Sequence, residues 1–248
     1  MTVAWPARAG EQLDLSIVIP VYNEIDNLEP LVGELLPVLH GLGRTFEIVL
    51  VNDGSTDGST AKIDELVARR VGVRGIHFRF NRGQTAAFDA GFRGARGRVI
   101  VTLDADLQND PADIPRVLQA LHGHDAAVGW RRERHDTAVR RWSSRIANAI
   151  RNRLSDDDII DTGCSLKAFR RDALAPVKLY TGMHRFLPTL IKMEGGTVVQ
   201  VPVNHRNRRA GSSKYGISNR ALRAFLDLLA VRWMKNRRLG YEVARDES

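Results

Sequence analysis

The amino-acid sequence predicts an α/β protein built on a doubly wound, mostly parallel sheet. In the first half of the chain, short runs of β-branched and apolar residues alternate with longer segments that have the apolar spacing of a helix. A polar turn follows each run, and this order of strand, turn and helix is typical of repeated βαβ units. The chain has 248 residues, of which 43% are hydrophobic, so it is long enough to bury a large core.

The individual elements follow in order along the chain. Strands are predicted at residues 15–21, 46–51, 73–78, 98–103 and 126–130. Helices are predicted at residues 25–39, 57–70, 84–96 and 111–122, the last with a proline at its start. Beyond about residue 135 the alternation weakens, and we expect a helix over 139–154, a short strand at 165–169, a helix after Met183 and a strand over 197–203. This second half is expected to pack on the same core and to form a further part of the site.

Positive charge gathers near the end of the chain. The net charge is +8, and residues 205–238 contain ten Arg or Lys against the single acid Asp227, so this segment carries +9. A second basic cluster lies between residues 131 and 153. An anionic membrane surface or a polyanion is therefore the expected partner.

The chain is divided as follows. Residues 15–219 are expected to form the main domain, residues 220–238 a basic amphipathic helix lying in a membrane interface, and residues 1–14 and 239–248 flexible tails. The alternative for the helix is that its apolar stripe docks on the core. No run reaches the roughly 20 apolar residues needed to span a bilayer. The single cysteine, Cys164, excludes an internal disulfide and favours a cytoplasmic location.

Two carboxylates one residue apart, Asp104 and Asp106, directly follow the fourth predicted strand. Ligands of α/β sheets bind at the carboxyl ends of the strands, and carboxylate oxygens suit a hard divalent cation that bridges a diphosphate. The alternative is an ordinary polar turn that closes a buried strand. Mg²⁺ or Mn²⁺ is the expected metal.

The first two strands also end in polar residues. Asp53 can accept a hydrogen bond from a base or ribose, while Gly54 and Gly58 allow close approach of the backbone. Taken alone, either loop could be a simple turn or helix cap. Three acidic strand ends in one parallel sheet converge on the same rim, however, and this favours a nucleotide site. No Gly-x-Gly-x-x-Gly or Walker sequence is present, which disfavours a dinucleotide enzyme or a P-loop NTPase.

The stretches at 17–24, 51–55, 81–84, 104–111 and 208–215 resemble those of the family 2 glycosyltransferases with a GT-A fold. Over residues 15 to about 234, the chain is similar to the polyprenyl-phosphate glycosyltransferases, a group that includes dolichol-phosphate mannose synthase and the bacterial undecaprenyl-phosphate sugar transferases. The resemblance implies a Rossmann-like nucleotide-binding half and an acceptor-side half.

The resemblance also implies roles for particular residues. Asp53 would bind the base or ribose of the donor. Asp104 and Asp106 would hold the metal, with Asp106 the better candidate for the direct ligand, and Gln84 would face the donor or merely cap a helix. The nucleotide-sugar site is thus expected to comprise Pro20, Tyr22, Glu24, Asp53, Gln84, Asp104, Ala105, Asp106 and Gln108.

The implied acceptor is a lipid monophosphate. A phosphate oxygen is already ionised at neutral pH, so its attack on the sugar needs positioning and charge stabilisation more than a strong base. The expected phosphate-binding residues are Arg131, Arg206, Arg208, Ser212 and Lys214. Asp161, expected with Arg131, Asp104 and Asp106 in the catalytic set, would orient Arg131 or the acceptor, act as a base, or simply close a turn. His184 also matches related enzymes, but no chemistry is assigned to it.

The sequence therefore predicts an inverting, metal-dependent glycosyltransferase of cell envelope glycan biosynthesis. It would move a sugar from a UDP- or GDP-sugar to a polyprenyl phosphate of the dolichyl or undecaprenyl type, while bound peripherally to the cytoplasmic face of the membrane. One alternative is a soluble GT-A transferase that acts on a saccharide or protein hydroxyl and needs an essential base. A non-catalytic nucleic-acid-binding module is disfavoured, because the basic segment lacks interleaved stacking aromatics.

Overall fold

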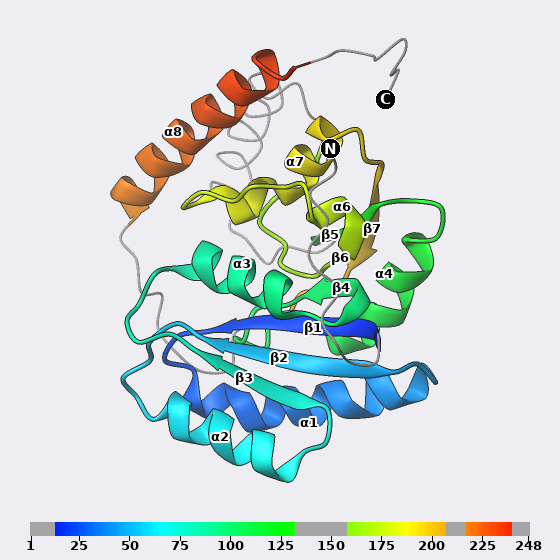
Figure 1. Cartoon of the computed structure of the whole chain (residues 1–248), viewed down its shortest axis with the longest axis vertical. Helices are drawn as coiled ribbons and strands as arrows, with labels where there is room; N and C mark the ends of the chain where they lie inside the picture. The colour runs from blue at the N-terminus through cyan, green and yellow to red at the C-terminus, as the bar shows by residue number, and fades with distance from the viewer. Residues whose placement is uncertain (1–12, 132–157, 207–216, 240–248) are drawn as a thin grey trace, which may run out of the picture.

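The computed structural model describes residues 13–131, 158–206 and 217–239, and for 217–224 the backbone only. A seven-stranded sheet in the order β3-β2-β1-β4-β6-β5-β7 forms its centre (Figure 1). The strands are β1 Leu13–Val21, β2 Phe46–Asn52, β3 Val73–His77, β4 Gly97–Thr102, β5 Ala126–Arg131, β6 Lys167–Arg170 and β7 Val198–Val203. All neighbouring pairs are parallel except those of β6, which runs antiparallel to β4 and β5. The predicted mostly parallel α/β sheet is confirmed.

Helices cover both faces of this sheet. One face carries α1 Ile25–Gly41, α2 Ser59–Arg69 and α4 Ile114–Ala120, whereas the other carries α3 Gln84–Gly94, α6 Arg171–Leu174 and α7 Leu187–Met193 (Figure 1). Side chains alternate along each strand, so Ile17 of β1 lies in the first core cluster and Val18 in the second. Burial on both faces explains why the strands consist of nearly continuous apolar runs.

Most predicted elements match the structure within one to three residues. The helix expected at 111–122 is divided into a 3₁₀ turn, Pro111–Asp113, followed by α4. A second 3₁₀ turn, Met183–Phe186, precedes α7. The short helix α6 was not predicted, and the helix expected at 139–154 lies outside the described residues.

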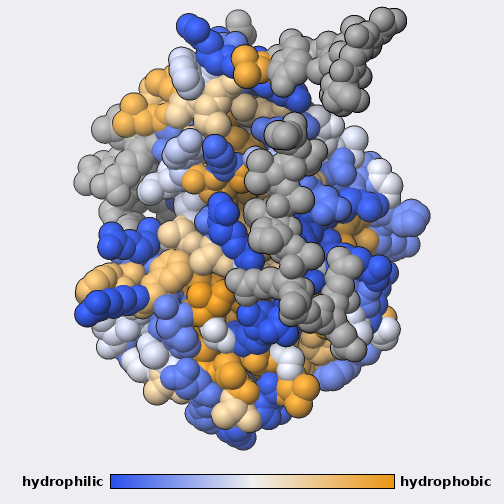
Figure 2. Space-filling model, in the orientation of Figure 1, coloured by the Kyte–Doolittle hydropathy of each residue, from blue (hydrophilic) through white to orange (hydrophobic). Residues whose placement is uncertain are grey.

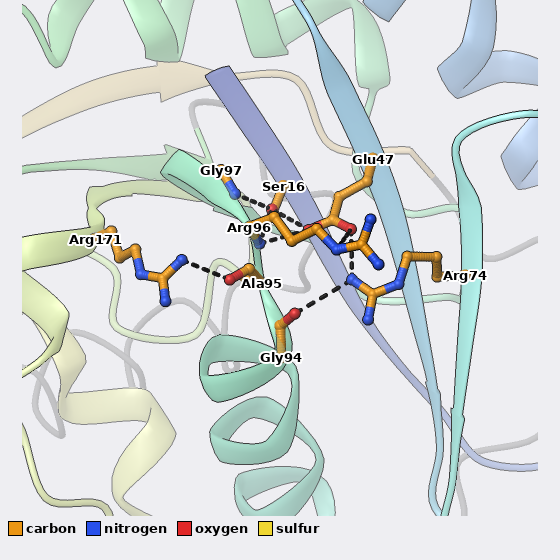
Figure 3. Close-up of polar contacts among 8 residues, drawn as sticks. All are labelled: Ser16, Glu47, Arg74, Gly94, Ala95, Arg96, Gly97 and Arg171. Carbon is orange, nitrogen blue, oxygen red and sulfur yellow. Dashed lines mark hydrogen bonds and ion pairs between the residues drawn. The ribbon is translucent and has the colours of Figure 1, made fainter. Parts of the chain in front are cut away.

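A buried polar network ties the amino ends of the strands to helix α3 (Figure 3). Glu47, only 2% exposed, forms an ion pair with Arg74 at 2.5 Å and accepts hydrogen bonds from the Ser16 hydroxyl at 2.7 Å and the Arg96 amide at 2.6 Å. Arg74 also donates to the carbonyl of Gly94 at 3.2 Å, so it caps the last turn of α3. The network fixes the far end of the helix whose first residue, Gln84, reaches the site described below.

Helix α8, Ile217–Asn236, overlaps the predicted amphipathic helix at 220–238. One side of it docks on the protein, because Leu228 and Val231 are 5% and 0% exposed and belong to the second core cluster. Apolar side chains also lie on its outer surface, where Figure 2 shows apolar area at the upper left: Phe225, Leu226, Leu229 and Trp233 are all exposed. Docking and an exposed apolar stripe therefore coexist on this helix. None of the described helices is both long and apolar enough to cross a bilayer.

Candidate active site

The predicted carboxylate pair lies in the loop that leaves β4. The Asp104 carboxylate accepts hydrogen bonds from the Ser165 hydroxyl and from the side-chain amide of Gln84, the latter at 2.7 Å. The Asp106 carboxylate, in a residue that is 8% exposed, accepts from the backbone amide of Gln108 at 3.2 Å. Four of the residues predicted to bind the donor are thus joined in two pairs, Gln84 with Asp104 and Gln108 with Asp106.

Burial and hydrogen bonds hold this loop in place despite a strained backbone position. Leu107 has a φ of 59°, a left-handed conformation that a bulky side chain rarely adopts, and it is 3% exposed in the core. The Asn109 side chain donates to the Ser165 hydroxyl at 2.6 Å, and the Arg206 amide donates to the Gln108 carbonyl at 2.8 Å. Because its apolar anchor and its backbone are both fixed, the loop presents the two aspartates in a preorganised position.

The electrostatics of the pair suit a cation. Burial, followed by the nearby Asp106 charge, raises the pKa of Asp104 to about 6. A divalent cation would remove this repulsion, and hard cations take carboxylate oxygens. The described residues contain no group of three or more His, Cys, Asp or Glu side chains arranged to hold a metal. The two carboxylates could supply only part of the oxygen ligands of such an ion.

A small cavity of about 100 Å³ opens beside Asp104. Its walls come from the loop before β6, from the second 3₁₀ turn and from α3. The lining residues are Gln84, Phe88, Thr102, Asp104, Thr162, Gly163, Cys164, Ser165, Lys167, His184, Arg185 and Leu187. His184 is placed by a hydrogen bond of 2.7 Å between its Nδ1 and the Thr85 hydroxyl. Cys164 is buried, which raises the pKa of its thiol to about 11 and argues against a nucleophilic role.

A larger cavity of about 450 Å³ lies at the carboxyl ends of β1, β2 and β3. The predicted residue Tyr22 lines it, together with Asn52, Gly54, Ser55, Thr56, Thr60, His77, Phe78, Arg79, Phe80 and Asn81. Asn52 donates to the Thr60 hydroxyl at 2.7 Å, and Phe80 is 60% exposed at the rim. A pocket with amide and hydroxyl groups inside and an aromatic ring at its edge can receive a nucleobase.

Asp53 lies beneath this pocket and does not line it. It is 3% exposed, and its carboxylate accepts hydrogen bonds from the backbone amides of Arg82 at 2.6 Å and Gly83 at 2.9 Å. Burial raises its pKa, against the lowering effect of these two amides. Asp53 thus contacts the loop between β3 and α3, and its predicted contact with the donor stays a prediction.

The remaining wall residues follow β1. Pro20 is half-buried near the end of the strand, and Glu24 accepts a hydrogen bond from the Asn27 side chain at 2.6 Å. Asn23 joins the loop after β1 to the loop after β2. Its side-chain oxygen accepts a hydrogen bond from the Thr56 backbone amide at 2.7 Å, and its backbone amide donates to the Ser55 hydroxyl at 3.0 Å. The two strand-end loops are therefore held together.

On the acceptor side, Arg131 and Asp161 form a bidentate pair. The Arg131 guanidinium donates from Nε to Oδ2 at 2.7 Å and from Nη2 to Oδ1 at 2.9 Å, and Asp161 is 4% exposed. The Asp161 carboxylate also accepts from the Gly163 amide at 3.1 Å. Asp161 is thus in direct contact with Arg131, and its predicted roles remain predictions.

Arg206, one of the residues predicted to bind the acceptor phosphate, has carboxylate partners within the protein. Its guanidinium forms ion pairs with Glu34 at 2.5 Å and Asp110 at 2.7 Å. In this position it ties the segment after β7 to α1 and to the carboxylate loop. Arg208, Ser212 and Lys214 lie outside the described residues.

Gly54 is required where the two nucleotide-side loops meet. It has a φ of 67°, and a Cβ at this position would lie 2.6 Å from the backbone N of Asn81 and 2.6 Å from the carbonyl carbon of Phe80. Gly54→Ala should therefore push the loop between β3 and α3 away from β2 and weaken binding of UDP or GDP by about tenfold or more, because left-handed strain of roughly 1–2 kcal/mol adds to the clash. Isothermal titration calorimetry measures this effect.

Gly43→Ala is the matched control, because Gly43 also has a positive φ, 62°, but has no atom within 4 Å of the added Cβ. It should carry the backbone strain and keep nucleotide affinity. Equal affinities in the two variants would contradict the importance of the close approach at Gly54.

Comparison with known proteins decides the family. Residues 16–177 match Glycosyl transferase family 2. The chain belongs to this family. It is 40% identical over 227 residues to the dodecaprenyl-phosphate galacturonate synthase of Rhizobium johnstonii, covering 89% of this chain and 67% of that one. It is 38% identical over 206 residues to the undecaprenyl-phosphate 4-deoxy-4-formamido-L-arabinose transferase of Edwardsiella ictaluri, covering 82% of this chain and 63% of that one. This family 2 chain thus spans about two thirds of the length of these relatives.

Solved structures confirm the GT-A fold of this family 2 glycosyltransferase. Glucosyl-3-phosphoglycerate synthase from Mycobacterium tuberculosis, in complex with Mn²⁺, UDP and phosphoglyceric acid, superposes with a TM-score of 0.66 at 18% identity, over 90% of this chain and 78% of the other. A mannosyltransferase from Pyrobaculum calidifontis in complex with GDP-Man and Mn²⁺ gives a TM-score of 0.59 at 20% identity, over 93% of this chain and 66% of the other.

Proposed function

We propose that this glycosyltransferase moves a sugar from a UDP- or GDP-sugar to a polyprenyl phosphate, with inversion at the anomeric carbon. The observation that carries the proposal is the position of the Asp104–Asp106 pair directly after β4. This strand lies in the sheet between the strands that end at the nucleotide-side cavity and β5, which carries Arg131. The names of the two relatives compared above, both polyprenyl-phosphate sugar transferases, support the choice of acceptor.

Each group has a distinct role in this proposal. A Mg²⁺ or Mn²⁺ ion held by Asp106 and Asp104 would neutralise the departing diphosphate. Gln84 positions the Asp104 carboxylate by donating a hydrogen bond to it at 2.7 Å. Tyr22 forms part of the pocket that would receive the nucleobase. Arg131, oriented by Asp161 through Nε and Nη2, binds the acceptor phosphate, because the N–H groups of a guanidinium suit phosphate oxygens. Arg208, Ser212 and Lys214 are proposed to complete this phosphate site.

An ionised phosphate is itself the nucleophile, so the proposed reaction needs no strong base. Asp161 serves better as an orienting group, since both of its carboxylate oxygens accept hydrogen bonds from Arg131. The phosphate oxygen attacks the anomeric carbon from the side opposite the diphosphate, which inverts the configuration. Positioning and charge stabilisation supply most of the rate enhancement in such a reaction.

The test is a panel of UDP- and GDP-sugars assayed with Mn²⁺ and undecaprenyl phosphate, with product detection by mass spectrometry. We expect one donor class to give a prenyl-phosphate sugar product. Saccharide and peptide hydroxyl acceptors are assayed in parallel, and transfer to these but not to the lipid phosphate would overturn the proposed acceptor.

We also propose that the enzyme attaches peripherally to the cytoplasmic face of a membrane through α8. Phe225, Leu229 and Trp233 are exposed on the outer side of this helix, while Leu228 and Val231 hold its inner side. Basic residues next to the stripe, including Arg232 and Lys235, would be attracted to anionic headgroups by roughly 1 kcal/mol each.

Binding to anionic liposomes should accordingly be reversible and salt-sensitive, because the attraction is screened at high ionic strength. Flotation at low and high salt measures this, and Trp233→Ser should reduce binding at both. Val67→Ser, which changes an exposed apolar side chain on α2, is the control. Failure of the wild type to float with anionic liposomes at low salt would rule out the interfacial role.

A further inference from the structure

Lys167 is a buried lysine that lines the small cavity beside Asp104. The proposed reaction gives this side chain no role. It opens β6 and is 5% exposed, and strand alternation places it on the same face of the sheet as Phe169. Its backbone lies opposite Thr102 of β4 and Val128 of β5. Among the described residues, its ammonium group has no hydrogen bond or ion pair, although it lines the cavity.

A buried ammonium without a partner is costly, because little water remains to solvate it. The charges of two carboxylates, Asp104 and Asp161, act on Lys167 without a hydrogen bond to it. Asp104 already accepts hydrogen bonds from Gln84 and Ser165 and lies in the proposed metal site. Asp161 is engaged by both nitrogens of the Arg131 fork. Neither aspartate therefore neutralises Lys167 by direct contact.

The rest of the cavity adds positive charge. Arg185 lines it from the second 3₁₀ turn, and Arg131 lies at its edge, since a Cβ on the lining residue Gly163 would be 3.0 Å from Arg131 Nη2. Phe88 and Leu187 supply apolar walls, which reduce the local dielectric and strengthen any charge pairing inside. Two basic side chains, Lys167 and Arg185, therefore line the cavity with one carboxylate, that of Asp104, and an anion would balance the remaining positive charge.

We propose that Lys167, assisted by Arg185, binds an oxyanion of a substrate at this position. Two groups have the required chemistry: a carboxylate on the donor sugar, as in a hexuronic acid, and the phosphate of the acceptor. The inference rests on the proposed function for the identity of the two substrates, but the binding of an oxyanion by Lys167 can be measured without turnover.

The experiment compares Lys167→Met, which keeps the length of the side chain but removes the charge, with Lys167→Arg, which keeps the charge. Lys178→Met is the matched control, because Lys178 is an exposed lysine outside the cavity. Calorimetry with UDP and GDP first selects the nucleotide. A hexuronate donor and the corresponding hexose donor of that nucleotide, such as the galacturonate and galactose pair, and a short prenyl phosphate are then titrated.

If the donor sugar carries the oxyanion, the wild type binds the hexuronate donor at least about tenfold more tightly than the hexose donor. Lys167→Met then abolishes this preference and leaves the affinity for the free nucleotide unchanged. If the acceptor carries it, the two donors bind alike to the wild type, and Lys167→Met weakens binding of the prenyl phosphate by about tenfold or more. Lys167→Arg retains part of the effect in either case, and Lys178→Met behaves as the wild type.

Unchanged affinity of Lys167→Met for all of these probes would overturn the proposal, and so would a wild type that binds neither the hexuronate nor the prenyl phosphate. Should Lys167→Met fail to fold, Arg185→Gln, in a half-buried residue, gives the same comparison. A wild type that shows Lys167-dependent binding but transfers no sugar would refute the proposed function and leave the oxyanion site intact.

Discussion

Asp106→Asn should reduce turnover by at least about 100-fold, because the loss of a metal-ligating carboxylate forfeits several kcal/mol of stabilisation of the diphosphate leaving group. The amide has nearly the same shape and can still accept the hydrogen bond from the Gln108 amide, so the loop should keep its conformation. Single-turnover assays with Mn²⁺, together with a melting curve of the variant, measure the two effects separately. Removal of metal by EDTA should reduce wild-type activity comparably, and Mn²⁺ should restore it.

The control for this variant is Asp172→Asn, which removes an exposed carboxylate from α6 away from the site. It should leave activity and metal dependence unchanged. Full activity of Asp106→Asn, or full activity of the wild type in chelator, would show that the aspartate pair has no role in metal binding. A variant that loses activity because it unfolds would instead be recognised by its melting curve.

The position of the aspartate pair could be predicted from sequence for a simple physical reason. Val99, Ile100 and Val101 form a buried central strand, and the polar run after them has to leave the sheet at its carboxyl end. In a parallel sheet this end is shared with the ends of β1 and β2, so the convergence of their polar loops follows from the fold class alone. Local composition and chain direction were sufficient to predict where the aspartate pair lies.

The strand β6 shows where such reasoning stops. Its antiparallel pairing with β4 and β5 depends on contacts with residues far away in the chain, and it places Lys167 directly beside Thr102. In the sequence these two residues are separated by a long intervening segment, and nothing local indicates that they meet. The only sequence signal for the buried position was Lys167 itself, a lysine inside an otherwise apolar run. Such a lysine more often lies on the solvent-facing edge of a sheet.

The predicted roles of Asp53 and Arg206 illustrate a second limit. Each side chain was assigned to a ligand from its chemical type, and the sequence could not show which partners within the protein the folded chain also provides for it. Asp53 accepts hydrogen bonds from the Arg82 and Gly83 amides, and Arg206 pairs with Glu34 and Asp110. Buried or half-buried charges find partners within the protein wherever these are available, and this competition is visible only in three dimensions.

The pair formed by Arg131 and Asp161 separates two mechanisms for the transfer step. If Asp161 only orients Arg131, Asp161→Asn should lower kcat/KM for the prenyl phosphate by about 10- to 100-fold, chiefly through weaker acceptor binding, and by less than Asp106→Asn does. The reason is that an asparagine presents one oxygen to the guanidinium where the carboxylate presents two. The pH dependence of the rate should keep its shape, since no proton is transferred to Asp161.

Arg131→Lys provides the matching change on the other side, because it retains the charge but loses the planar guanidinium that binds Asp161 through two nitrogens. If the two residues act as one unit, the double variant Asp161→Asn with Arg131→Lys should be little worse than the poorer single variant. Single-turnover rates and acceptor titrations on all four proteins complete this cycle. A loss at Asp161 larger than that at Asp106, with acceptor binding unchanged and the acidic limb of the pH profile removed, would instead identify Asp161 as an obligatory base. A phosphate nucleophile does not require such a base, so that result would favour a hydroxyl group as the true acceptor.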